Sequence, residues 1–410
     1  MTASQNAVLT PKLLRRQIID AVRGAATVPP RCPHAPPAGM CGGCTFQAYS
    51  YPAQIDAKLV ALRLIWADSS LPAIGFVASP DAFAYRTRMD FVASKSRFGL
   101  RRGGKFNYII DLDQCHLIPE RAFVAARALY DRAVALGLPD YNLHSHEGFV
   151  RYIVVRRSPD DRLLLSIVTA APEKAGVDLA ALEDLAATAL AQDGVVAFHW
   201  LINDTLTDLS FGEPRAHWGS ATLPMVVGDR TLQIGPNTFF QNNIHLLLPL
   251  LEDVAVEVVA AGRPERVADL YGGVGTIALH LAESVGQITS VESVGESAAL
   301  AQQNIADNGC ANVRAVHADV LDFLRTQTPG SFDVLVADPP RTGLGPEVCA
   351  EVLRLRPARI VYVSCNPITQ HEDAQILAAG YTLERLTGYD MFPQTPHMEA
   401  LGVFSKKLGD

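Results

Sequence analysis

The sequence predicts an α/β protein whose C-terminal half forms a doubly wound, mainly parallel sheet. From about residue 245 onward, apolar strand patterns alternate regularly with helical patterns. Only residues 390–397 separate the last two strand patterns, which is too few for the crossover that a parallel pair needs. The final strand is therefore expected to run antiparallel to the strand before it.

Seven strands are expected in this half. They lie at 267–271, 287–292, 313–317, 333–338, 359–364, 382–389 and 399–405, with helices between most of them. In the N-terminal half, an amphipathic helix is expected at 52–66. Its apolar face would consist of Ile55, Leu59, Leu62 and Ile65. The other expected elements are strands within 85–118 that turn at Gly103-Gly104, a helix at 119–137, strands at 149–157 and 162–169, a helix at 177–192, and strands near 195–203 and 231–235.

Pattern and composition divide the chain into four regions. They are an N-terminal extension at 1–30, a cysteine-containing region at 31–118, a central α/β domain at 119–235 and the doubly wound domain at 236–410. The chain contains no run of about 18 apolar residues and no signal-like apolar segment near its start. We therefore expect a cytoplasmic protein without a membrane partner.

The formal net charge of −8 argues against non-specific nucleic-acid binding by the whole molecule. Residues 85–108, the basic strip, differ from the rest because they contain seven basic residues and a single acid, Asp90. Five aromatic residues are interleaved with these charges: Tyr85, Phe91, Phe98, Phe106 and Tyr108. Such a strip suits phosphate contacts and base stacking, although a solvated hairpin can have the same composition.

In open α/β sheets, ligands bind at the carboxyl ends of the strands. A glycine-rich turn at 271–275 follows the first predicted strand, and Glu292 ends the second, where it could bind ribose hydroxyls. This pair would equally serve a dinucleotide-dependent oxidoreductase. The Asp-Pro-Pro-Arg segment at 338–341 and the antiparallel last strand favour S-adenosylmethionine instead.

Cys365 follows an apolar strand, and Asn366-Pro367 force a turn that should aim its sulfur into the cleft. A thiolate there can add to C6 of a pyrimidine and make C5 a nucleophile toward a methyl group. The C5 proton must then leave, and Glu399 is the candidate base, with an ion-paired strand residue as the alternative. Cys310 and Cys349 are expected to be small buried hydrophobes.

Five ordered motifs resemble the RNA uracil-5 methyltransferases, and most closely their iron–sulfur-containing 23S rRNA branch. They are Phe-Phe-Gln-Asn-Asn at 239–243, Asp-Leu-Tyr-Gly-Gly-Val-Gly at 269–275, Asp-Pro-Pro-Arg at 338–341, Ser-Cys-Asn-Pro at 364–367 and Asp-Met-Phe-Pro…His-Met-Glu at 390–399. The resemblance covers about residues 32–407. It implies the class I methyltransferase fold for 236–410, with Cys365 as nucleophile and Glu399 as base.

The same resemblance implies a pocket for S-adenosylmethionine and uracil. Its expected lining residues are Gln241, Tyr271, Glu292 and Asp338, with Asp319 near the adenine. The central domain at 119–235 would then bind RNA.

Four N-terminal cysteines form a second candidate site: Cys32, Cys41, Cys44 and Cys115. Four thiolates suit either tetrahedral zinc or a [4Fe–4S] cluster, and their spacing does not choose between the two. The resemblance implies the cluster, so that 31–118 would be an iron–sulfur region carrying the basic strip. Only 31 residues precede Cys32, so the small β-barrel RNA-binding domain that many relatives carry is not expected in this sequence.

The expected function is S-adenosylmethionine-dependent methylation of C5 of a specific uridine in 23S rRNA by a monomeric enzyme. A tRNA T-loop uracil-5 methyltransferase is the alternative within this class. A non-catalytic RNA-binding iron–sulfur protein and a small-molecule methyltransferase are the alternatives from other classes. The presence of Cys365 and Glu399 argues against a non-catalytic binder, which needs neither.

Overall fold

The computed structural model describes residues 10–69, 71, 73–175, 177–178 and 180–407. The chain forms two compact units. Unit 1 comprises Met1–Val28, Tyr49–Pro80 and Leu248–Asp410, and unit 2 comprises Pro29–Ala48 and Asp81–Leu247. The division into the four expected regions stays a prediction; Tyr49–Pro80, expected within the cysteine-containing region, belongs to unit 1. Within the described part of the chain, no helix is long and apolar enough to cross a lipid bilayer.

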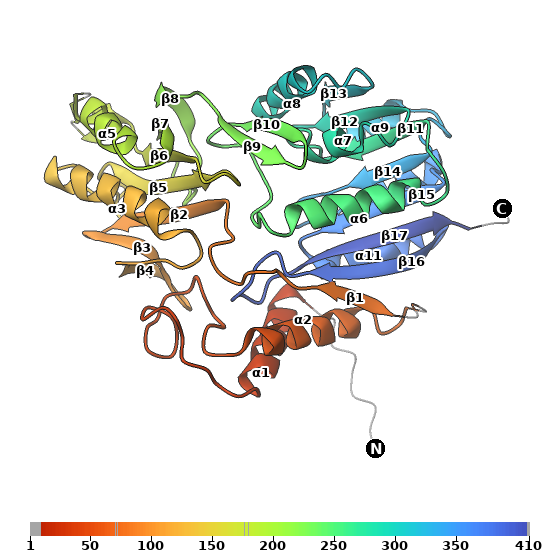
Figure 1. Ribbon diagram of the computed structural model, residues 1–410, viewed down its shortest axis with the longest axis horizontal. Coiled ribbons are helices and arrows are strands. Elements are labelled where there is room, and N and C mark those ends of the chain that lie inside the picture. The colour runs from red at the N-terminus through yellow and green to blue at the C-terminus, as the bar shows by residue number, and fades with distance from the viewer. Residues whose placement is uncertain (1–9, 70, 72, 176, 179, 408–410) are drawn as a thin grey trace. The chain divides into compact units, whose positions relative to one another are not determined.

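Unit 1 contains an eight-stranded sheet in the order β1-β16-β17-β15-β14-β11-β12-β13 (Figure 1). Its strands are β1 (Ile74–Val77), β11 (Arg266–Leu270), β12 (Gln287–Glu292), β13 (Val313–His317), β14 (Val334–Ala337), β15 (Arg359–Ser364), β16 (Tyr381–Tyr389) and β17 (Glu399–Lys406). All neighbours pair in parallel except β17, which is antiparallel to both β15 and β16. The seven predicted strands and the antiparallel last strand are confirmed. The short edge strand β1 was not predicted.

Helices connect the strands of unit 1. They are α1 (Pro11–Arg23), α2 (Tyr51–Ile65), α6 (Leu247–Val259), α7 (Thr276–Leu281), α8 (Gly295–Asp307), α9 (Val320–Thr326), α10 (Gly345–Leu355) and α11 (Pro367–Leu377). Helix α10 contacts α9 and α11, α11 contacts α2, and α1 packs against α2. In Figure 1, α6 lies in front of the sheet, where its Glu257 binds Arg359 of β15 and Arg385 of β16.

The helix at 52–66 exists as α2, but its buried face differs from the predicted one. Ile55 and Leu59 are only partly buried, whereas Gln54 and Lys58 are fully buried. Lys58 Nζ donates to Asp390 Oδ1 at 2.5 Å, and both side chains are completely shielded from solvent. The apolar period therefore predicted the helix correctly and its buried face only in part, because a distant carboxylate makes burial of the lysine possible.

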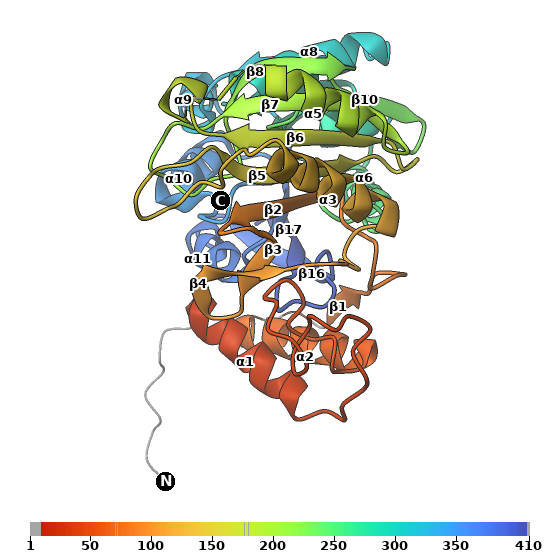
Figure 2. The same cartoon turned by 90° about the vertical axis from the view of Figure 1, so that its left-hand side faces the viewer.

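Unit 2 contains a seven-stranded sheet in the order β4-β3-β2-β5-β6-β7-β8 and a separate β9–β10 hairpin. Its strands are β2 (Arg88–Ser94), β3 (Arg97–Arg102), β4 (Lys105–Asp111), β5 (Val150–Arg157), β6 (Leu163–Thr169), β7 (Val195–Ile202), β8 (Glu213–Gly219), β9 (Leu223–Val227) and β10 (Arg230–Ile234). Its helices are α3 (Glu120–Ala135), α4 (Pro172–Ala175) and α5 (Ala180–Leu190). Figure 2 shows α3 and α5 on one face of the seven-stranded sheet.

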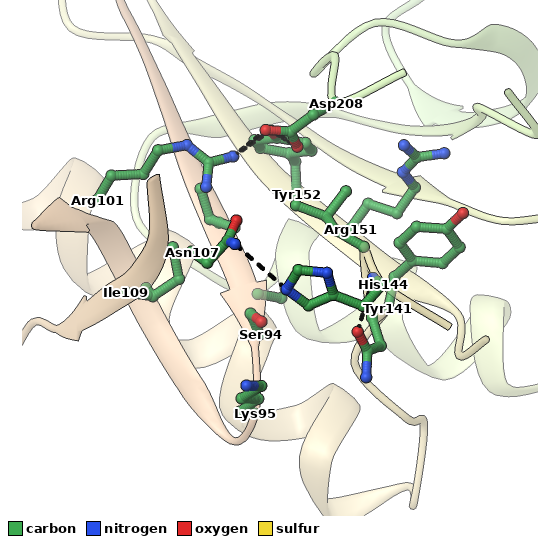
Figure 3. A pocket seen from close by; sticks show the side chains of 14 residues that line it. Ser94, Lys95, Arg101, Asn107, Ile109, Tyr141, His144, Arg151, Tyr152 and Asp208 are labelled. Carbon is green, nitrogen blue, oxygen red and sulfur yellow. Dashed lines mark hydrogen bonds and ion pairs between the residues drawn. The ribbon is translucent and has the colours of Figure 1, made fainter. Parts of the chain in front are cut away.

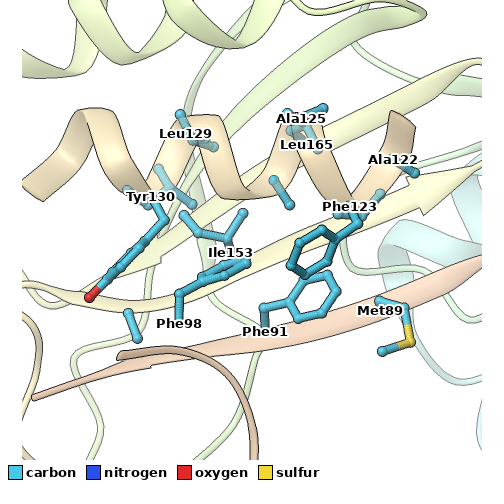
Figure 4. Close-up of a cluster of buried hydrophobic side chains, with 14 of the residues drawn as sticks. Met89, Phe91, Phe98, Ala122, Phe123, Ala125, Leu129, Tyr130, Ile153 and Leu165 are labelled. Carbon is cyan, nitrogen blue, oxygen red and sulfur yellow. The ribbon is translucent and has the colours of Figure 1, made fainter. Parts of the chain in front are cut away.

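The core of unit 2 lies between this sheet and α3 (Figure 4). Phe98 stacks on Tyr130 at a centroid distance of 5.1 Å, and Phe91 meets Phe123 edge-on at 5.5 Å. Both Phe91 and Phe98 belong to the basic strip, and Tyr85 of the strip is also fully buried. Three of the five aromatic residues in the strip therefore serve the core.

Candidate active site

The glycine-rich turn after β11 has a constrained backbone. Tyr271 has φ 62°, a conformation that is uncommon for a bulky residue and that concentrates at functional sites. A Cβ on Gly272 would lie 1.9 Å from Ser290 Oγ, so only glycine fits there. Gly273 also has a positive φ, 58°, but no heavy atom lies within 4 Å of the place where its Cβ would be. The turn therefore exposes backbone to open space, which suits the close approach of a cofactor.

Glu292 at the end of β12 binds this turn directly. Its Oε2 accepts a hydrogen bond from Gly273 N at 2.9 Å, and its Oε1 accepts one from Val294 N at 2.6 Å. The carboxylate thus joins the glycine turn to the end of the neighbouring strand, where parallel pairing of β11 with β12 brings the two together.

Asp319 follows β13 and caps helix α9. Its Oδ1 accepts hydrogen bonds from Leu321 N at 2.8 Å and Asp322 N at 3.2 Å. Burial raises the pKa of the Tyr271 hydroxyl to about 12, and the charge of Asp319 adds to this effect. Asp319 therefore combines a capping role with a position near Tyr271.

Cys365 and Glu399 lie next to each other at the ends of adjacent strands. Ser364 of β15 pairs with Ala400 of antiparallel β17. Cys365 follows Ser364 and Glu399 precedes Ala400, so the two residues lie opposite each other just beyond this pair. Glu399 is 2% exposed, and its Oε2 is buried without a hydrogen-bond partner among the described residues. A buried, unsatisfied carboxylate oxygen costs free energy and is expected where it has a chemical role.

Both groups have shifted proton affinities. Burial raises the pKa of the Cys365 thiol to about 11, and the charges of Glu399 and Asp338 raise it further, against the opposing charge of Arg341. Burial raises the pKa of Glu399 well above its usual range, and Asp338 contributes in the same direction. The sequence-predicted residues Asp338, Cys365 and Glu399 are thus brought together in one electrostatically coupled group.

A pocket of about 290 Å³ opens at Cys365. Its lining residues are Pro11, Lys12, Leu14, Arg15, Arg341, Cys365, Asn366, Pro367, Pro396, His397 and Met398. Asn366 Nδ2 donates to Arg341 O at 2.9 Å, which links the turn after β15 to the turn after β14. The pocket therefore combines the predicted nucleophile with residues of the turns after two neighbouring strands and with the unpredicted helix α1.

Two buried side chains of α2 support this pocket, and the sequence did not point to them. Lys58 Nζ binds Asp390 and also donates to Phe392 O at 3.2 Å. Gln54 Nε2 donates to Gln394 Oε1 at 3.0 Å, and Gln394 N donates back to Gln54 Oε1 at 3.1 Å. These contacts fix the 390–398 segment that leads into Glu399. The sequence shows two polar residues, Gln54 and Lys58, on a helix, but it does not show that they are buried.

The chain is similar to known RNA methyltransferases in both sequence and structure. The model for tRNA (uracil-5-)-methyltransferases matches residues 222–408. An uncharacterized RNA methyltransferase of Caldanaerobacter subterraneus is 31% identical over 95% of this chain and 88% of that protein. The tRNA (uracil(54)-C(5))-methyltransferase of Pyrococcus horikoshii is 31% identical over 88% of this chain and 83% of that protein.

This chain belongs to the RNA uracil-5 methyltransferase family. Its structure is similar to that of the Pyrococcus abyssi tRNA (uracil-54, C5)-methyltransferase in complex with S-adenosyl-L-homocysteine, with a TM-score of 0.75 and 28% identity over 89% of this chain and 86% of that one. The protein is therefore an RNA (uracil-5-)-methyltransferase that uses S-adenosylmethionine.

One predicted cofactor residue of this methyltransferase, Gln241, lies in unit 2. Its carbonyl accepts a hydrogen bond from Thr87 Oγ1 at 2.9 Å, and Thr87 N donates to Asn242 O at 3.0 Å. The buried guanidinium of Arg156 donates to Gly235 O at 2.8 Å and to Thr238 O. The loop that carries Gln241 thus has a fixed backbone, and contact of its side chain with the cofactor stays a prediction.

The four predicted cluster cysteines of the methyltransferase are all buried in the core of unit 2. Burial raises the pKa of Cys44 and of Cys115 to about 12 each, and the charge of Arg86 opposes this shift in both. The described residues include no group of three or more His, Cys, Asp or Glu side chains arranged to hold a metal ion. The metal site therefore stays a prediction.

The segment from Cys32 to Cys44, the cysteine loop, is hydrogen-bonded to the β3–β4 hairpin of the basic strip. Gly42 N donates to Arg101 O at 2.8 Å, and Gly103 N donates to Met40 O at 2.9 Å. On this hairpin, Phe106 and Tyr108 are 58% and 41% exposed. Arg101 lies 4.1 Å from the centre of the Phe106 ring. The exposed part of the strip thus pairs cations with accessible aromatic rings.

A small pocket with a mixed polar and apolar lining lies beside this hairpin in unit 2 (Figure 3). Arg101 and Tyr152 both bind Asp208, and Asn107 lies 3.2 Å from His144 Nε2. Its volume of about 30 Å³ holds one or two waters, so it is too small for a base. RNA contacts of unit 2 are therefore expected on the exposed rings and not in this pocket.

Proposed function

We propose that the protein methylates C5 of one uridine in a structured RNA, with Cys365 as the nucleophile and Glu399 as the base. The observation that supports this most strongly is the β15–β17 register, which brings a half-buried thiol beside a buried carboxylate with an unpartnered oxygen. A protein that only binds RNA would gain nothing from such an arrangement, which costs stability.

The proposed reaction begins when the sulfur of Cys365 bonds to C6 of the uracil. The electron pair of the C5=C6 bond then moves into the C5–C4–O4 system as an enolate. When bound, S-adenosylmethionine would supply an electrophilic methyl group to C5, and the methyl–sulfur bond would break so that S-adenosylhomocysteine leaves with its electron pair. Glu399 next accepts the C5 proton, and the electron pair of that C–H bond restores C5=C6 as the Cys365 thiolate leaves.

The raised pKa of Glu399 suits its role as a base, and the charge of Arg341 partly offsets the raised pKa of the Cys365 thiol. A carboxylate whose pKa is raised holds a proton more strongly, so Glu399 is a better acceptor for the C5 proton than an ordinary glutamate. Arg341 favours the thiolate form of Cys365. The glycine turn fits S-adenosylmethionine, because open space surrounds Gly273 and Glu292 is held beside it. We propose that Tyr271, Glu292, Asp319, Asp338 and Gln241 hold the cofactor and the uracil.

The RNA class remains a choice between two candidates. The motif resemblance favours 23S rRNA, as expected from the sequence. The Pyrococcus relatives are named for uridine 54 of tRNA, which favours tRNA to a comparable degree. Mass-spectrometric nucleoside mapping of both RNAs, from cells with and without the gene, separates the candidates. Loss of one 5-methyluridine from either RNA identifies the substrate, and unchanged RNA would contradict the proposed function.

A [4Fe–4S] cluster on Cys32, Cys41, Cys44 and Cys115 is also part of the proposal. Backbone N–H groups donate to three of these four sulfurs: Gly43 N donates to Cys41 Sγ at 3.5 Å, His34 N and Ala35 N donate to Cys32, and Leu117 N donates to Cys115. Such bonds stabilise thiolates that bind iron. Because the cysteine loop is joined to the β3–β4 hairpin, the cluster would order the exposed rings for RNA.

The mechanism is tested by trapping. RNA that carries 5-fluorouridine at the target allows addition and methyl transfer, but fluorine cannot leave as a proton does. The native protein should form a stable covalent adduct that survives denaturing electrophoresis, and C365A should form none. An adduct with C365A, or none with the native protein on an RNA that it methylates, would overturn the assignment of the nucleophile.

A further inference from the structure

Helix α1 forms one wall of the pocket that contains Cys365. Four of its residues line that pocket: Pro11, Lys12, Leu14 and Arg15. Leu14, Ile18 and Val22 are buried and fix the helix to unit 1, where it packs against α2. Thr10 caps its start by accepting a hydrogen bond from Leu13 N. The helix is thus held at the pocket by its own apolar face.

The lining of this pocket is strongly positive. Lys12 and Arg15 lie three residues apart, on the same side of α1, and both are exposed. Arg341 is the third cation of the lining, which includes no aspartate or glutamate. Among the described residues, no carboxylate forms an ion pair with any of these three side chains. By contrast, Arg16 and Arg23 on the same helix both pair with Asp20.

We propose that Lys12, Arg15 and Arg341 bind the phosphates that flank the target uridine when its base enters the Cys365 pocket. The inference rests on the proposed function and adds the groups that position its substrate. A volume of about 290 Å³ lies at the lower end of ligand pockets, so it admits a single nucleotide and not a helix. A base flipped into such a pocket leaves its phosphates at the rim, where exposed cations can reach them.

A matched pair of double variants tests this inference. K12A/R15A and R16A/R23A each remove two positive charges from exposed positions of one helix, but only the first pair lines the pocket. The KM for an RNA substrate, its dependence on salt and the kcat are measured for both variants and for the native protein. Thermal melting confirms that each variant is folded.

K12A/R15A should raise the KM at least several-fold, with kcat at saturating RNA and affinity for S-adenosylmethionine unchanged. The slope of log KM against log salt should fall by about 1.4, since each single-strand phosphate contact contributes about 0.7. R16A/R23A should leave the slope as in the native protein. Equal salt slopes for the two variants would overturn the inference. A lower KM in K12A/R15A than in the native protein would also overturn it, because it would indicate that α1 covers the pocket.

Failure of this inference is distinguishable from failure of the proposed function. If the native protein methylates RNA and the two variants behave alike, only the role of α1 is wrong. If the native protein methylates neither 23S rRNA nor tRNA, the proposed function itself fails. R341A provides an independent check, because it should lower the salt slope as well as slow the chemical step through Cys365.

Discussion

Cys365 and Glu399 are adjacent because the antiparallel β15–β17 ladder ends at the Ser364–Ala400 pair. One strand supplies the thiol at its carboxyl end, and the other supplies the carboxylate at its amino end. Only an antiparallel strand inserted beside β15 can present its first residue there. The reversed strand β17 is thus the structural reason why the proposed nucleophile and the proposed base are adjacent.

Glu399→Gln should stop the reaction after methyl transfer. An amide cannot accept the C5 proton, so the covalent adduct should accumulate on ordinary uridine RNA and kcat should fall by about 10²–10⁴-fold. Denaturing electrophoresis with labelled RNA detects the adduct. The double variant C365A/E399Q is the control and should form none. Normal turnover by E399Q would show that another group removes the proton.

The reactivity of Cys365 should increase with pH. Burial raises its pKa to about 11, so the thiolate fraction is small at neutral pH and grows about tenfold for each pH unit until the pKa is approached. Alkylation of the free protein by iodoacetamide, followed by peptide mass spectrometry at Cys365, measures this directly. Arg341→Ala should shift the alkylation profile to higher pH, because the charge of Arg341 opposes the rise of the pKa. A profile already flat at neutral pH would contradict this prediction.

Lys58→Met should destabilise the protein strongly. It leaves the buried Asp390 carboxylate without its cation, which costs about 3–5 kcal/mol in comparable buried pairs. Urea unfolding of K58M, D390N and K58M/D390N gives the coupling energy through a double-mutant cycle. The double variant should be more stable than the sum of the single losses predicts. Additive losses would show that the two side chains do not interact.

Removal of the exposed rings of the basic strip should weaken RNA binding. Phe106→Ala or Tyr108→Ala should each cost about 1–3 kcal/mol if the ring stacks on a base. Leu206→Ala is the control, since Leu206 is an exposed apolar residue of unit 2 outside the strip, with 71% exposure. Fluorescence anisotropy at fixed salt measures the affinities. Equal affinities for all three variants would indicate a solvated hairpin, the alternative interpretation of this segment.

Protein purified without oxygen should be brown and contain about four irons per chain if the four cysteines hold a [4Fe–4S] cluster. The variant C41S/C44S should lose the iron, whereas C310S should keep it, since Cys310 is a buried cysteine of unit 1. Metal analysis and the visible absorption spectrum provide the measurement. A colourless protein with one zinc would show that the cluster assignment is wrong.

The sequence alone determined the doubly wound sheet, the antiparallel last strand and the cluster of chemistry-bearing residues at its edge. This succeeded because strand and helix periods are local properties, and because parallel strands carry their carboxyl ends to one edge. The positions of Cys365 and Glu399 at strand ends follow from those local patterns, so the chain itself predicts them.

Tertiary structure decided which polar groups are buried and which face the pocket. Lys58 looks like a solvent-facing residue of α2, but Asp390, 332 residues away, makes its burial possible. Asp319 caps α9 through hydrogen bonds that form only where this helix begins. Lys12 lines the pocket only because α1 packs against α2. A periodic pattern reports one face of one element, whereas burial of a charge depends on a partner that another part of the chain supplies.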